Sequence, residues 1–111
     1  MAVPSTPLFG NPTRVDGDVD GDIAIKASPG KLWAVMLEGG SDASSLDFYD
    51  HATSADGLTP IFGVTAPFTD VNASSQSTVF ISFVKIGGID FATGIWCDWT
   101  GTGAVGYVWY S

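Results

Sequence analysis

The sequence predicts an all-β protein built as a single antiparallel β-sandwich. Runs rich in aromatic and β-branched residues alternate with turn residues at intervals of roughly eight to twelve residues, a spacing typical of sandwich and barrel domains. No long stretch repeats its apolar residues with a helical period, so essentially no α-helix is expected. A chain of 111 residues, 45% of them hydrophobic, suffices for one domain with a modest core. We therefore expect a jelly-roll-like sandwich over residues 23–111, preceded by an extended arm.

Residues 1–22 are expected to form that arm. Prolines at positions 4, 7 and 12 disfavour helix and most sheet pairing, because proline lacks a backbone N–H and has a fixed φ. The acidic run Asp16–Asp22 follows, and repulsion among its carboxylates favours an extended chain. Leu8 and Phe9 are apolar side chains of this arm, and we expect them to dock on a neighbouring molecule.

Seven strands are expected after the arm. They cover Asp22–Ala27, Leu32–Glu38, Ser45–Asp50, Thr59–Thr65, Ser77–Ile86, Asp90–Trp99 and Ala104–Tyr110. Turn residues separate these runs, mainly glycine, serine, proline and aspartate. Because side chains alternate across a strand, each run divides into a core face and an opposite face. The expected core faces are Ile23 and Ile25; Trp33, Val35 and Leu37; Leu46 and Phe48; Phe62 and Val64; Val79, Ile81 and Phe83; and Ile95, Cys97 and Trp99.

The last two runs are expected to form a β-hairpin around Gly101-Thr102. A hairpin with one face in water would be polar at every second residue, whereas this one is largely apolar on both faces. One face is therefore expected to bury in the core and the other against a partner. Together with Leu8 and Phe9 of the arm, the expected interface residues are Phe80, Val84, Trp96, Val108 and Tyr110.

The composition points to self-association and excludes several partners. Charged residues make up only 14% of the chain, so a tight homo-oligomer is expected, most simply a homotrimer. The net charge is −8, and the scattered basic residues form no stripe that could neutralise phosphates, so we expect neither direct nucleic-acid binding nor adhesion to anionic membranes. The N-terminus lacks the features of a secretory signal and no apolar run is long enough to cross a bilayer, so synthesis without export is expected.

The acidic run resembles the start of a calcium-binding loop. Asp16, Asp18 and Asp20 precede Gly21, but the twelfth position of an EF-hand loop, which requires Glu, falls on Ala27. A looser calcium site formed by Asp16, Asp18, Asp20 and Asp22 is the alternative to a solvated acidic arm. We expect the solvated arm, and no metal or other cofactor.

The remaining polar motifs do not form a catalytic constellation in the sequence. Asp50 beside His51 is compatible with a triad, but no Gly-x-Ser-x-Gly nucleophile elbow is present. Cys97, the only cysteine, has no adjacent histidine or cation to stabilise a thiolate and is expected in the core. Glu38, the only glutamate, lies at an expected strand end. The chain is therefore not expected to be an enzyme. The four tryptophans and three tyrosines could instead form a platform that stacks on sugars, although the mid-strand positions of these aromatic residues favour core and interface roles.

Three stretches, over residues 27–38, 46–57 and 91–105, carry a resemblance to a known class of proteins. They read Ala-Ser-Pro-Gly-Lys-Leu-Trp-Ala-Val-Met-Leu-Glu, Leu-Asp-Phe-Tyr-Asp-His-Ala-Thr-Ser-Ala-Asp-Gly and Phe-Ala-Thr-Gly-Ile-Trp-Cys-Asp-Trp-Thr-Gly-Thr-Gly-Ala-Val. The arrangement resembles small virion proteins of tailed bacteriophages, of the head-decoration or cement kind. The acidic run Asp16–Asp22 is not part of that resemblance.

The resemblance implies a non-enzymatic component of the virion with a β-sandwich fold. Such a protein would be made in the host cytoplasm, form a homotrimer, bind the major capsid protein on the outer capsid surface and stabilise the shell. The alternative expectation is a β-sandwich module associated with the phage tail or a fibre, which binds a host glycan.

Overall fold

The protein was analysed as a computed structural model that describes residues 12–17, 21–40, 44–55, 57–66 and 78–111. The elements are β1 (Thr13–Asp16), β2 (Ile23–Lys26), β3 (Gly30–Glu38), β4 (Ser44–Asp50), β5 (Phe62–Ala66), β6 (Thr78–Ser82), the 3-10 helix η1 (Val84–Ile86), β7 (Ile89–Phe91), β8 (Ile95–Thr100) and β9 (Val105–Tyr110). The described part of the chain holds no α-helix and is nearly all β, which confirms the predicted all-β class.

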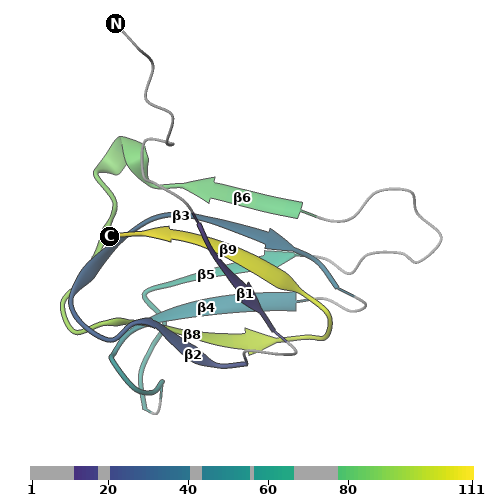
Figure 1. The fold of residues 1–111 in the computed structure, drawn as a ribbon, viewed down its shortest axis with the longest axis horizontal. Coiled ribbons are helices and arrows are strands. Elements are labelled where there is room, and N and C mark those ends of the chain that lie inside the picture. The colour runs from purple at the N-terminus through teal and green to yellow at the C-terminus, as the bar shows by residue number, and fades with distance from the viewer. Residues whose placement is uncertain (1–11, 18–20, 41–43, 56, 67–77) are drawn as a thin grey trace, which may run out of the picture.

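The strands form two antiparallel sheets (Figure 1). One sheet has the order β1-β9-β3-β6, with β7 pairing β3 beyond the end of β6 along the same edge. The other has the order β2-β8-β4-β5. We call them the five-stranded and the four-stranded sheet.

The strand pairings are nested. β1 pairs with β9, β2 with β8, β3 with β6 and β7, and β4 with β5, so that strands early in the chain find partners late in the chain. Successive nested pairs alternate between the two sheets. Figure 1 shows the outermost pair, where β1 in purple crosses the view beside β9 in yellow.

Both sheets contribute to one hydrophobic core, as expected of a β-sandwich. β3 supplies Leu32, Val35 and Leu37, and the four-stranded sheet supplies Phe48 and Ile95 among others, all with no exposed surface. A fully buried side chain of this size contributes about 1.5–3 kcal/mol. The core therefore holds the two sheets together face to face.

Most of the predicted core positions are confirmed, with two exceptions. Ile23 is 37% exposed, and Trp33 lies outside the core cluster with its Nε1 donating to the Ser111 hydroxyl at 3.0 Å. The register of β3 against β9 shifts between Leu32 and Ala34. Strict alternation fails across such a bulge, which is why both Leu32 and Val35 face the core.

The predicted C-terminal hairpin is wrong. β8 belongs to the four-stranded sheet and β9 to the five-stranded sheet, so the segment between them crosses from one layer to the other. Gly101 and Gly103, both with positive φ, provide the bends. The two strands meet face to face through the core, since a Cβ on Gly106 would lie 3.2 Å from the Trp99 ring.

The predicted arm is also wrong over residues 13–16. This segment is β1, which pairs with β9, and its Val15 is only 3% exposed and belongs to the core. The prolines counted against sheet pairing do not lie within these four residues, so each N–H can donate. The sandwich therefore includes residue 13. Leu8 and Phe9 lie outside the described residues.

Two predicted strands are interrupted. The run Asp90–Trp99 is divided into β7 and β8, because the N–H groups of residues 92–94 point to the Asp50 carboxylate and not to a neighbouring strand. The run Ser77–Ile86 is a strand only as far as Ser82 and then continues as η1, which ends at Gly87 with φ 81°. The other predicted strands occur with small shifts at their ends, the largest in β5, which begins at Phe62.

Candidate interaction surfaces

The outer face of the five-stranded sheet carries a continuous apolar surface. Across the sheet, Met36 of β3 lies between Tyr107 of β9 and Phe80 of β6. In the next row Ala34 lies opposite Trp109, and the Phe80 and Trp109 rings meet edge to face at 5.7 Å. We call this surface the apolar face, formed by Met36, Phe80, Val105, Tyr107 and Trp109 over a fully buried Ala34.

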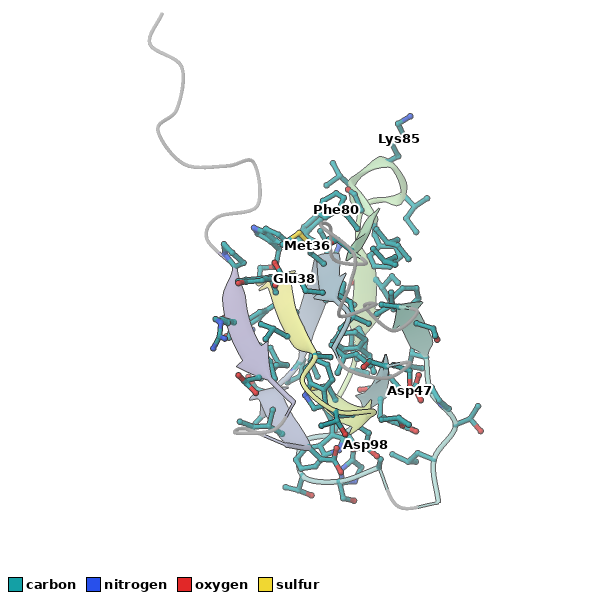
Figure 2. All side chains as sticks on the ribbon, turned by 90° about the vertical axis from the view of Figure 1, so that its right-hand side faces the viewer. Met36, Glu38, Asp47, Phe80, Lys85 and Asp98 are labelled. Carbon is teal, nitrogen blue, oxygen red and sulfur yellow. The ribbon has the colours of Figure 1, made fainter. Side chains whose placement is uncertain are left out.

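The apolar face is most exposed at Phe80 on the edge strand β6, and charged residues border it on β1 and at the end of β3. Phe80 is 52% exposed, an unusual exposure for a phenylalanine that stands mid-strand. On β1, opposite Tyr107, the Arg14 guanidinium contacts Asp16 at 3.5 Å. Figure 2 shows Glu38, at the end of β3, close to Met36 and Phe80. Apolar residues bordered by charged ones are a common feature of protein–protein interfaces.

The structure separates the residues predicted for an interface. Phe80 lies on the apolar face, Trp96 lies on the outer face of the other sheet, and Val84 is a half-buried residue of η1. Val108 is fully buried and Tyr110 packs against the core, so neither lies on the surface assigned to it.

Val108 and Tyr110 were assigned to the outer surface because the prediction exchanged the inner and outer faces of β9. Once β9 pairs with both β1 and β3, residues 104, 106 and 108 face the other sheet, and Tyr107 and Trp109 face outward. The alternation of side chains divides β9 into these two faces, but it does not determine which face is internal. Met36 was not among the expected interface residues, although it alternates with the core residues Val35 and Leu37.

The outer face of the four-stranded sheet carries carboxylates and aromatic rings. Asp47 of β4 lies directly opposite Asp98 of β8, and Tyr49 lies directly opposite Trp96 in the next row. The Trp96 Nε1 donates a 2.6 Å hydrogen bond to the Asp98 Oδ1. We call this surface, formed by Asp47, Tyr49, Trp96 and Asp98, the acidic–aromatic face.

Electrostatics on the acidic–aromatic face disfavour further negative charge. The pKa of Asp47 is raised, first by its partial removal from water and then by the Asp98 carboxylate. The pKa of Tyr49 is raised by burial and by the negative charges of Asp47, Asp98 and Asp22. Gly63 of β5 lies opposite Asp47, and a Cβ at this glycine would collide with the Asp47 carboxylate.

Asp50 and His51 organise loops and do not face a serine nucleophile among their described contacts. Asp50 accepts hydrogen bonds from the N–H groups of Thr93 at 2.7 Å and Ala92 at 3.1 Å. Burial opposes ionisation of Asp50, but these backbone bonds outweigh it and lower its pKa. The His51 Nδ1 accepts 3.0 Å bonds from two N–H groups of its own loop, at residues 53 and 54. Both side chains therefore have structural partners.

The two calcium candidates that the structure describes have other partners. Asp16 contacts Arg14, and an Asp22 oxygen accepts a 2.8 Å hydrogen bond from the Trp99 N–H. Asp18 and Asp20 lie outside the described residues. Within the described ranges no group of three or more metal-binding side chains is positioned to hold an ion. Cys97 is buried and its Sγ lies 3.4 Å from the carbonyl oxygen of Ile23.

The described residues include no helix that is long and apolar enough to cross a membrane. No family model matches the chain, and neither a curated protein nor a solved structure is found that matches it.

Proposed function

We propose that this protein is a non-enzymatic structural component of a bacteriophage virion, which binds the outer surface of the capsid and stabilises it. The apolar face is the observation that carries this proposal. A chain with so few charged residues leaves Met36, Phe80 and Trp109 on one outer surface, where a soluble monomer would place charges. Such a surface gains free energy when a second protein covers it.

The nested strand pairings support a jelly-roll assignment within this proposal. A jelly roll is a double-sheet sandwich of eight strands formed by two Greek keys, and virus capsid domains and lectins are among the proteins that use it. The orders β1-β9-β3-β6 and β2-β8-β4-β5 correspond to that arrangement, with β7 as a short extra strand on β3. Because one fold serves many functions, the topology supports the virion role without defining it.

The proposed quaternary structure is a homotrimer whose subunits meet through the apolar face. Several copies held in one ring present several capsid-binding surfaces at once, and their weak contacts sum through avidity. The major capsid protein is the proposed partner of the assembled ring. The capsid surface of the virion is the proposed location.

The oligomeric state in solution tests the proposed interface. Light scattering after size-exclusion chromatography is expected to give the mass of a trimer for the wild-type chain and a monomer for Phe80→Glu. Leu58→Glu is the matched control, because Leu58 is a 41% exposed apolar residue in the connection between β4 and β5. A wild-type monomer, or dissociation by the control as well, would overturn the assignment of the interface.

The location requires a separate experiment. Gold-labelled antibodies against the chain are expected to decorate the heads of purified phage particles uniformly. Labelling of tails or fibres would instead favour the alternative, a glycan-binding module. The observation that favours this alternative is the Tyr49–Trp96 pair on the acidic–aromatic face, because aromatic rings stack on the apolar faces of sugars.

A further inference from the structure

The carboxylates of the acidic–aromatic face have no basic partner within the described part of the chain. All four basic residues are described, and the ion pairs formed there join Arg14 to Asp16 and Lys31 to Asp90. Lys26 packs beside Gly30, where a Cβ would lie 2.9 Å from the Lys26 Cδ. Lys85 projects from the tip of the molecule that lies away from Asp47 and Asp98 (Figure 2).

The like-charged pair therefore persists in the folded protein. Like charges directly opposite each other on neighbouring strands destabilise a sheet. The raised pKa of Asp47 reflects partial burial first and this repulsion second. A cation that bound between the two carboxylates would remove the repulsion, whereas a neutral ligand would leave it in place.

The neighbouring aromatic rings are placed to contact the same ligand. Trp96 and Tyr49 form the row next to Asp98 and Asp47. The 2.6 Å bond from the Trp96 Nε1 to Asp98 fixes the indole relative to the carboxylate. The side chains of Asp47, Tyr49, Trp96 and Asp98 are partly exposed to solvent. Small residues occupy several other positions of this outer face, namely Ala24, Ser45, Gly63, Thr65 and Thr100.

We propose that the acidic–aromatic face binds an arginine side chain of a partner protein. A guanidinium group is planar, donates two parallel hydrogen bonds to a carboxylate and stacks on tryptophan or tyrosine, so it matches both components of this face. The net charge of −8 adds long-range attraction for a basic partner. The inference goes beyond the proposed virion role and does not depend on it, because it concerns a different sheet from the apolar face.

The test is an NMR titration of the full chain with N-acetyl-arginine amide. The Trp96 Nε1–H resonance, assigned by its disappearance in Trp96→Phe, is the reporter. A saturable shift of this resonance is expected at probe concentrations on the order of millimolar, as suits a single side chain. The neutral isostere N-acetyl-citrulline amide is expected to cause no shift. Equal shifts with both probes would overturn the proposal, because binding would then not depend on positive charge.

Variants locate the site. Asp47→Asn is expected to weaken binding of the arginine probe by about tenfold, the effect of losing one charge-assisted hydrogen bond. Asp90→Asn makes the same change of net charge on the five-stranded sheet, at a residue whose side chain is 85% exposed, and is expected to bind like wild type. Thermal melting of both variants verifies that they are folded.

Three further outcomes would contradict the proposal. The first is equal weakening by the two variants, which would show that only net charge matters. The second is unchanged binding by Asp47→Asn. The third is a shift of the Trp96 resonance by a neutral oligosaccharide with none by the arginine probe, which would assign the face to a glycan.

Discussion

Asp47 on β4 and Asp98 on β8 occupy directly opposite positions on one outer sheet face. The folded chain raises the pKa of Asp47 through partial burial and through Asp98, so it holds a proton there more tightly than the unfolded chain does. The contribution of this proton to stability is fully present below the ordinary pKa of 3.8. It is lost as the pH rises from 3.8 through the higher pKa of the folded state.

Asp47→Asn is therefore expected to stabilise the protein near neutral pH. The free energy of unfolding should rise by about 0.2–1 kcal/mol, the range for a cross-strand charge pair. The gain should shrink toward zero at about pH 3, where the wild-type carboxyl is protonated. Denaturant unfolding at the two pH values measures the difference. An equal gain from Asp90→Asn would attribute the effect to net charge alone.

The contribution of Asp50 to stability depends on pH in the opposite direction. Its pKa is lowered by the backbone bonds from residues 92–94, so its stabilisation is present above the ordinary Asp pKa of 3.8 and is lost as the pH falls through the lower pKa of the folded state. Asp50→Ala should lower the free energy of unfolding near neutral pH by about 1 kcal/mol, because hydrogen bonds to a charged group are lost and solvent screening at this exposed site limits their contribution. Chemical denaturation tests this, with Asp90→Ala as the control. Unchanged stability would mean that water replaces the carboxylate at no cost.

β1 is expected to be part of the cooperative unit. Val15→Asp places a carboxylate in the core and should cost more than about 3 kcal/mol, enough to unfold much of a marginally stable domain. Thr13→Asp, on the same strand at an exposed position, should change the stability by less than about 0.5 kcal/mol. Thermal melting followed by circular dichroism compares the two. Similar melting temperatures would mean that β1 detaches without disturbing the sandwich.

The sequence was sufficient for most of the strands and insufficient for their partners. β3 and β4 were predicted within a few residues, because their apolar residues and flanking turns are local signals. The residues 101–103 offered the same glycine-rich signal for a hairpin and for a crossing between sheets. The crossing depends on β9 pairing with β1 and β3, which are distant in sequence. A local pattern does not contain that information.

The same limit applied to the candidate surfaces. The sequence indicated an apolar outer surface and identified Phe80, but it assigned Val108 to the surface because the two faces of β9 are almost equally apolar. The acidic–aromatic face was not predicted. Asp47 and Asp98 lie 51 positions apart in the sequence and become neighbours only when β4 pairs with β8. Alternation placed Trp96 and Asp98 on one face of their strand, and only the strand order adds Tyr49 and Asp47 to them.

The pairing of the first described strand with the last has a consequence for how the protein is made. Until residues 105–110 leave the ribosome, β3 lacks the neighbour on one side and β1 lacks any partner in its sheet. The sandwich can therefore close only after residues 105–110 have been synthesised, and its many distant contacts favour folding in milliseconds to seconds. During that interval the unpaired edge of β3 can pair with other nascent chains. Aggregation is therefore expected to increase when many chains are synthesised at once.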